Sequence, residues 1–124
     1  MGSLFKNLGV QGAVIDGACR DTDELRDLGF VVFSRGVTAR GTHTMFSGRK
    51  EDVELNVPVQ CGGLLVNAGD MVIADEIGVT IVPAANLESV LKLAREQAER
   101  EEATRQRIKQ GRTFEQLLEE FGRI

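Results

Sequence analysis

Hydrophobic residues in the first third of the chain form two short runs with a polar stretch between them. Residues 13–15 and 30–34 are almost uniformly apolar, which is typical of strands buried in a parallel sheet. Residues 21–28 have the spacing of a short helix that the following glycine can end. Residues 3–8 predict a further helix, ended by Gly9. The pattern therefore predicts a short helix followed by a strand–helix–strand unit.

The middle of the chain changes from an irregular segment to closely spaced short strands. Residues 35–55 have no sustained hydrophobic period and are locally basic, which predicts a long surface loop. Loops of this length in compact domains are usually functional or disordered. Beyond the loop, short apolar runs separated by turn signals predict strands at residues 57–60, 63–66, 71–74 and 78–82.

The last third of the chain is helical in pattern. A helix predicted from Asn86 to about Gln110 has an apolar stripe only in its first turns. Its polar second half either projects into solvent through charge pairs or lies against another subunit. Thr113-Phe114-Glu115-Gln116 has the spacing of a capping box and begins a last short helix with an apolar side. We therefore expect an α/β core at residues 1–84, and C-terminal helices at residues 85–124 that pack on the core or on a neighbouring subunit.

Composition and charge limit the classes of function. A chain of 124 residues is one domain by length and is long enough to bury a core. A net charge of −4 with scattered basic residues disfavours direct binding of nucleic acid. Two cysteines, Cys19 and Cys61, and one histidine are too few for a zinc site, and they predict reduced thiols in a cytoplasmic protein. No apolar run reaches the ~18 residues of a membrane span, so we expect no membrane partner.

The adjacent pair Arg20 and Asp21 is the main candidate for chemistry. The apolar run before it ends at a turn around Gly17, which places the pair at a strand end, where α/β proteins commonly bind ligands. One explanation is structural: Asp21 and Glu24 have the spacing of a capping box, and Arg20 would then be an ordinary surface residue. Taken by themselves, the residues favour this cap.

The other explanation is a binding site for a small acid. The planar guanidinium of Arg20 suits bidentate binding of a carboxylate, and the carboxylate of Asp21 suits a divalent cation that keeps several waters. A 2-oxo acid held on Arg20 could then present its keto oxygen to that cation, which would polarise it. The two roles are therefore chemically linked.

The wider sequence around the pair resembles a known family. Residues 12–21 read Gly-Ala-Val-Ile-Asp-Gly-Ala-Cys-Arg-Asp, and this stretch resembles the 4-hydroxy-4-methyl-2-oxoglutarate aldolases and the regulators of ribonuclease activity. The resemblance covers roughly residues 9–105, and its blocks occur in the family's order. The further blocks lie at residues 32–41, 56–63, 68–70, 74–79 and 82–83.

The resemblance implies a fold and a reaction. The implied fold is α/β with a swivelling-domain-like (β/β/α) core, a small parallel-plus-hairpin sheet and a C-terminal helical tail. The implied activity is that of a metal-dependent lyase of the class II pyruvate aldolase type, which also decarboxylates oxaloacetate. Arg20 matches the arginine that binds the substrate carboxylate, and Asp21 matches the aspartate that binds Mg2+ or Mn2+. The resemblance also implies a pyruvate- or oxaloacetate-type 2-oxo acid as substrate, and a homo-oligomer, a trimer or a hexamer.

The chain departs from the family in length, which leaves rival functions open. Family members are nearly twice as long, so the chain resembles their C-terminal half and is expected to lack the N-terminal loop that holds the substrate. The alternative to the lyase is a non-catalytic, protein-binding regulator resembling the inhibitors of ribonuclease E, which carry the same Arg-Asp pair. A structural remnant without activity is a third possibility. The Arg-Gly-x-x-x-Arg-Gly run at residues 35–41 resembles the aldolase branch more closely.

Other polar positions have ordinary structural explanations. His43, alone in the predicted loop, is expected to be exposed rather than catalytic. Asp70 and Asp75 occupy turn positions, where aspartate commonly binds its own backbone. Gly62-Gly63 is expected to permit a tight entry into a strand or close packing rather than to bind phosphate. Glu96 could supply a carboxylate to a neighbouring subunit, although a solvated face explains it more simply.

Overall fold

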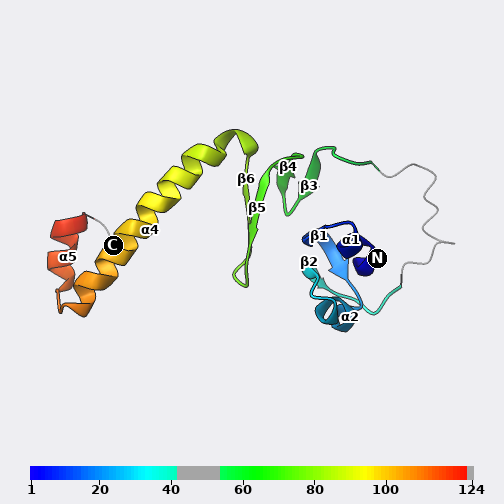
Figure 1. The fold of residues 1–124 in the computed structure, drawn as a ribbon, viewed down its shortest axis with the longest axis horizontal. Helices are drawn as coiled ribbons and strands as arrows, with labels where there is room; N and C mark the ends of the chain where they lie inside the picture. Colours follow the sequence, from blue (N-terminus) through cyan, green and yellow to red (C-terminus); the bar gives the residue numbers. More distant parts are fainter. Residues whose placement is uncertain (42–53, 123–124) are drawn as a thin grey trace. The chain divides into compact units, whose positions relative to one another are not determined.

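The chain begins with a short helix, followed by the strand–helix–strand arrangement that the hydrophobic pattern predicts (Figure 1). The structure is a computed structural model and describes residues 1–41 and 54–122; His43 and most of the predicted loop lie outside this part. β1 and β2 pair in parallel, with a crossover helix between them. The first elements are α1 (Gly2–Asn7), β1 (Gly12–Cys19), α2 (Thr22–Asp27) and β2 (Val31–Val37).

β1 is longer than the sequence predicts, because the chain does not turn at Gly17. Ile15 pairs with Ser34 and Ala18 pairs with Gly36, so β1 has one more residue than β2 between these two pairs. Asp16 and Gly17 therefore lie opposite a single residue of β2. This is a β-bulge, which is rare between parallel strands. The predicted turn at Gly17 is wrong, and the strand continues through the bulge to Cys19.

Short paired strands follow, as predicted. β3 (Val59–Cys61) and β4 (Leu64–Val66) form an antiparallel hairpin. Gly62 and Gly63 join them with φ angles of 61° and 82°, the backbone that a tight two-residue hairpin turn requires. The glycine pair thus forms a hairpin turn, where the sequence predicts a tight strand entry or close packing. β5 (Met71–Ala74) and β6 (Val79–Val82) form another two-stranded sheet.

The turns around β5 are closed by aspartate side chains. The Asp75 carboxylate accepts hydrogen bonds from the backbone N–H groups of Ile77, at 2.8 Å, and Gly78, at 3.2 Å. Asp70 likewise accepts one from the N–H of Asn67 at 2.8 Å. The structural roles predicted for both aspartates are confirmed, because each satisfies backbone donors that the turn leaves open.

The described chain divides into two compact units, Met1–Ile81 and Val82–Ile124. The second unit contains a short 3-10 turn, η1 (Ala84–Asn86), and two helices, α4 (Leu87–Lys109) and α5 (Phe114–Phe121). The predicted capping box is present: the Thr113 side chain accepts from the Gln116 N–H, and the Gln116 side chain accepts from the Thr113 N–H. In residues 1–41 and 54–122, no helix is both long and apolar enough to cross a membrane.

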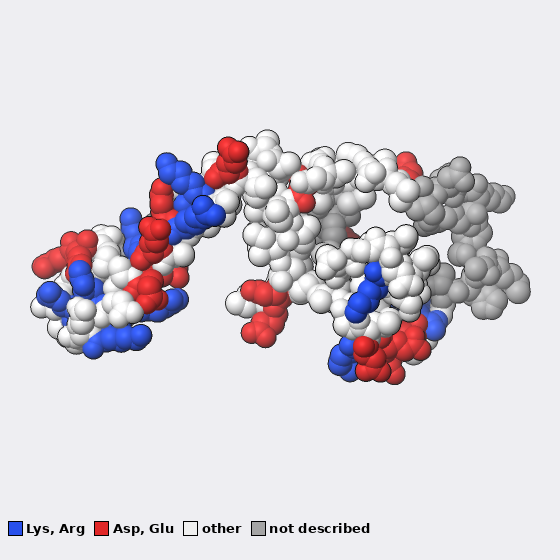
Figure 2. Space-filling model, in the orientation of Figure 1, with Lys and Arg blue, Asp and Glu red and all other residues white. Residues whose placement is uncertain are grey.

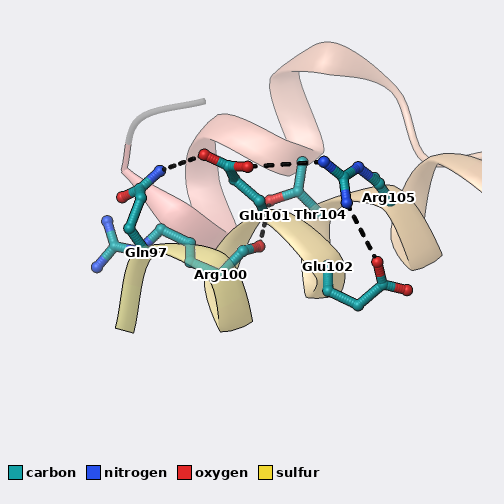
Figure 3. A network of polar contacts seen from close by, with 6 residues as sticks. All are labelled: Gln97, Arg100, Glu101, Glu102, Thr104 and Arg105. Carbon is teal, nitrogen blue, oxygen red and sulfur yellow. Dashed lines mark hydrogen bonds and ion pairs between the residues drawn. The ribbon is translucent and has the colours of Figure 1, made fainter. Parts of the chain in front are cut away.

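Charge pairs support the polar second half of α4. Arg105 lies 3.6 Å from Glu101 and 3.4 Å from Glu102, and Gln97 donates a hydrogen bond to Glu101 at 3.1 Å (Figure 3). Basic and acidic side chains alternate along α4 and α5 in Figure 2. Glu96 is paired with Lys92 one turn earlier, at 3.9 Å. The predicted i,i+4 pairs are therefore present and offset part of the cost of an exposed polar helix.

Few side chains of the described residues are buried. The buried apolar ones are Phe30, Val82 and Leu117, and Thr104 is the buried polar one. Strand residues that the pattern predicts to be buried are partly exposed instead, with Val31 at 54% and Ile15 at 39%. The physical reason is that each sheet in this part of the chain has two strands. Paired strands lie edge to edge, so they leave the faces of the sheet for other elements to cover.

Leu117 and its neighbour Leu118 give a matched test of the packing of α5. Leu117 is 4% exposed, whereas Leu118 is 38% exposed. We expect Leu117→Ala to lower the free energy of unfolding of the helical unit by about 2–5 kcal/mol, because it leaves a cavity in a packed site. Leu118→Ala should cost clearly less. Urea unfolding followed by circular dichroism at 222 nm measures both, and equal losses would contradict the packing described.

Candidate functional site

Arg20 and Asp21 lie together where β1 ends and α2 begins. The Arg20 Nε donates to both carboxylate oxygens of Asp21, at 3.0 and 2.8 Å. Both side chains are about half exposed, at 50% and 47%. The hydrogen bond and the charge of Asp21 raise the pKa of the Arg20 guanidinium, and Glu24 adds a smaller effect of the same sign. The two predicted site residues thus form one ion pair at the surface.

The backbone of Asp21 excludes the capping explanation for this pair. Asp21 has φ 57° and ψ 43°, in the left-handed region, and its side chain makes no hydrogen bond to the amides of α2. A non-glycine residue in this region costs on the order of 1 kcal/mol, although aspartate tolerates it better than most. The capping box predicted for Asp21 and Glu24 is therefore wrong, because the left-handed backbone directs the carboxylate to Arg20. Strained residues of this kind concentrate at functional sites.

A cavity of about 250 Å3 lies beside the ion pair. Its walls are mostly apolar and come from α1, β1, α2 and the start of β2. Its polar lining consists of Cys19, Arg20, Asp21 and Glu24, together with Ser3. A mostly apolar hollow with a few polar groups at one edge is the usual form of a small-molecule site. Sequence reasoning missed Glu24 as a lining residue, because its spacing from Asp21 assigned it to a cap.

The segment after β2 returns to the end of β1. The Thr38 N–H donates to the Cys19 carbonyl at 2.9 Å, and the Thr38 hydroxyl accepts from the Arg40 N–H at 3.1 Å. A Cβ atom at Gly41 would lie 2.8 Å from the Nη1 of Arg20. Gly41 therefore allows the backbone to approach the guanidinium closely, a contact that no pattern in the sequence indicates.

Asp16 connects the bulge of β1 to β2 and to the turn between β3 and β4. One carboxylate oxygen accepts from Arg35 Nε on β2, and the other accepts from the Gly62 N–H in the β3–β4 turn at 2.9 Å. The Asp16 side chain is 29% exposed. The hydrogen bond from Arg35, followed by the one from Gly62, holds the pKa of the Asp16 carboxyl below its usual value. Asp16 is therefore a second polar centre near the candidate site.

The side chains that line the cavity can be assessed as ligands for a metal ion. The part of the chain that the structure describes has no group of three or more His, Cys, Asp or Glu side chains arranged to hold a metal. Asp21 and Glu24 offer carboxylate oxygens at this cavity, and Cys19 is the one softer group in its lining. Mg2+ is commonly held by one or two carboxylates, with water and substrate completing its six ligands. The residues present thus fit a hard, largely hydrated cation and do not fit zinc.

Comparisons with known proteins give a consistent assignment. Residues 1–81 match a family model described as RraA-like, Aldolase/RraA. A Halalkalibacterium halodurans protein, provisionally named as a 4-hydroxy-4-methyl-2-oxoglutarate aldolase, is 36% identical over 105 residues, which are 85% of this chain and 48% of that protein. An Arabidopsis thaliana protein with the same kind of name is 38% identical over 81 residues, covering 65% of this chain and 46% of its own length. The chain spans about half the length of the curated relatives it matches.

The fold has a solved counterpart. An uncharacterized protein from Pseudomonas syringae pv. tomato superposes with a TM-score of 0.82 and 27% sequence identity. The match covers 98% of this chain and 55% of that one. The mixed α/β fold with small sheets and C-terminal helices, predicted from the sequence, is confirmed.

The lowered pKa of Asp16 predicts a specific dependence of stability on pH. A carboxyl with a folded pKa below its unfolded value, about 3.9, stabilises the fold above that pH and loses the effect as pH falls through the folded pKa. We expect the difference in urea midpoint between the wild type and Asp16→Asn to be largest above about pH 5 and to shrink toward pH 2.5. A difference that is constant across this range would contradict the ionic link.

Proposed function

This chain belongs to the RraA-like, Aldolase/RraA family, and we propose that it carries the carboxylate- and metal-binding part of a lyase site for 2-oxo acids. The observation that carries the proposal is the Arg20–Asp21 pair at the edge of an apolar cavity. The provisional names of the relatives support aldolase chemistry. Oxaloacetate decarboxylation and cleavage of 4-hydroxy-4-methyl-2-oxoglutarate both break a carbon–carbon bond and both yield pyruvate.

Arg20 would bind the carboxylate of the substrate. Its Nε is engaged by Asp21, which leaves the two terminal nitrogens for a carboxylate on the outer side of the guanidinium. The ion pair fixes the plane of the guanidinium before substrate arrives, so less side-chain entropy is lost on binding. The apolar wall of the cavity would take the carbon skeleton and exclude water from one side of it.

Asp21 would hold Mg2+ or Mn2+, with Glu24 available at the same cavity. When bound, the divalent cation would polarise the keto oxygen and stabilise the charge that develops as the carbon–carbon bond breaks. The two oxygens of Asp21 share the single N–H of Arg20 Nε, and a carboxylate has about four acceptor sites, so oxygen lone pairs remain for a cation. The left-handed backbone keeps these oxygens away from the amides of α2.

Oxaloacetate turnover tests the two roles. We expect Mg2+-dependent decarboxylation by the wild-type chain, and a fall of at least about 100-fold in kcat/KM for both Asp21→Ala and Arg20→Ala. Asp21→Ala removes the group that would hold the cation, and Arg20→Ala removes the group that would position the substrate carboxylate. Pyruvate formation coupled to lactate dehydrogenase measures the rate. Asp23→Asn is the matched control: Asp23 is an exposed neighbour on α2 that does not line the cavity.

The same measurement separates the lyase from its alternative. A folded wild-type chain with no metal-dependent turnover at high concentration would overturn the lyase assignment for this chain. It would favour the non-catalytic regulator, which shares the Arg-Asp pair. We also propose that the protein acts as a homo-oligomer, a trimer or a hexamer, and sedimentation of the purified chain tests that state directly.

Gly41 gives a second test that substitutes neither residue of the ion pair. Gly41→Ala places a methyl group against the end of the Arg20 side chain, which can swing aside at little cost in stability but no longer points to the same place. We expect the KM for oxaloacetate to rise by between about tenfold and a hundredfold, since small displacements of positioning groups have effects of this size. Gly78→Ala is the control, because a Cβ there meets open space. An unchanged KM in Gly41→Ala would contradict the role given to Arg20.

A further inference from the structure

The bulge in β1 lies directly before the candidate site. Asp16 and Gly17 together face Arg35, and Arg20 follows Gly17 by three residues. Gly17 has the widest conformational freedom of any residue type, so the direction of the chain after it is poorly fixed by local sterics. A bulge also redirects the strand and strengthens its local twist. Something outside the strand must therefore hold this point if the site is to have one geometry.

The bulge determines which side chains of β1 face the cavity. In a regular strand, side chains two residues apart share a face, so Ala13, Ile15 and Gly17 would share one. The extra residue in the bulge replaces Gly17 by Ala18, so that Ala13, Ile15 and Ala18 line the cavity, joined at the end of the strand by Cys19. Arg20 follows Ala18 by two residues and also lines the cavity. Closing the bulge into a regular strand would shift this alternation by one residue.

Asp16, one of the two bulge residues, links the bulge to structure outside β1. Its carboxylate binds Arg35, the one residue of β2 that lies opposite the bulge, and the Gly62 N–H of the β3–β4 turn. Gly62 stands in a tight two-residue turn whose backbone is fixed by the hairpin. Asp16 thus ties the bulge to two independent pieces of structure. Beyond the bulge, the Cys19 carbonyl is held by the Thr38 N–H at 2.9 Å.

We propose that Asp16 is a positioning residue: through Arg35 and Gly62 it fixes the bulge of β1, and so sets where Arg20 leaves the strand. The functional consequence rests on the lyase site proposed above, whereas the geometric one does not. Asp16 does not line the cavity and touches no substrate in this assignment. Its effect on binding should therefore pass entirely through Arg20.

The test compares Asp16→Asn in the full chain with Asp75→Asn as a matched control. Asp75 accepts two backbone hydrogen bonds in a turn of the same unit, whereas Asp16 accepts one from the Gly62 turn and one from Arg35, and the Asp75 bonds do not reach the bulge. The first readout is the 1H–15N signal of Arg20 Nε, identified by its loss in Arg20→Lys. We expect this signal to move in Asp16→Asn and to stay in place in Asp75→Asn, because the pairing of Nε with Asp21 depends on where the chain leaves β1.

The second readout is a double-mutant cycle on the KM for oxaloacetate. We expect Asp16→Asn to raise KM about tenfold in the wild type and less than about twofold in an Arg20→Ala background, because coupled residues are not additive. Arg35→Lys, which keeps the positive charge, should perturb both readouts less than Arg35→Met. Where a variant at Asp16 fails to fold, this pair of Arg35 variants carries the same test.

Two results separate this proposal from the proposed function. A variant Asp16→Asn that is less stable, yet leaves the Arg20 Nε signal and the KM unchanged, would overturn the positioning role and leave the lyase assignment intact. A wild-type chain without turnover, in which Asp16→Asn still moves the Arg20 signal and Asp75→Asn does not, would support the positioning role and remove the lyase assignment. Equal effects of Asp16→Asn on KM in the wild-type and Arg20→Ala backgrounds would also overturn the positioning role.

Discussion

The parallel pairing of β1 with β2 is the constraint on which the candidate site depends. Parallel strands end at the same edge of a sheet, so the residue after β1 and the segment after β2 are brought together although a helix separates the strands in sequence. This places Arg20 and Asp21 beside Thr38 and Gly41. An antiparallel pairing would put the two segments at opposite edges. The strand direction, rather than any single side chain, therefore assembles the site.

Polar contacts in this chain fix local geometry more than they add global stability. The ion pairs Arg20–Asp21 and Arg107–Glu120 are both substantially exposed, and solvent screening leaves such pairs with little effect on stability. Their value lies in orientation, because a guanidinium that donates from Nε to both oxygens of one carboxylate has few other positions open to it. Asp16 differs from these pairs because one of its two partners is a backbone N–H in a rigid turn.

The elements of the fold could be predicted because their signals are local. Gly9, Gly29 and Gly111 end helices at positive φ, and Thr113 with Gln116 begins α5 as a capping box. Each of these depends on residues within a few positions of one another. The bulge could not be predicted, because Gly17 is as suitable for a turn as for a bulge, and Arg35 and Gly62 decide between them from distant positions. The exposure of the strands likewise depends on which elements pack on them, and the hydrophobic pattern alone does not specify those elements.

The site shows the same division between local and tertiary information. The residues Asp-x-x-Glu at 21–24 favour a capping box when taken by themselves, but they also fit a binding site, because both need an acidic side chain before a helix. The structure decides between them: the Asp21 backbone is left-handed, and its carboxylate binds the Arg20 Nε and not the amides of α2. The pair alone is neutral, and under the proposed function a divalent cation would leave the cavity edge with an excess of positive charge. A 2-oxo acid brings the compensating carboxylate to Arg20, so cation and anionic substrate should bind more tightly together than either does alone.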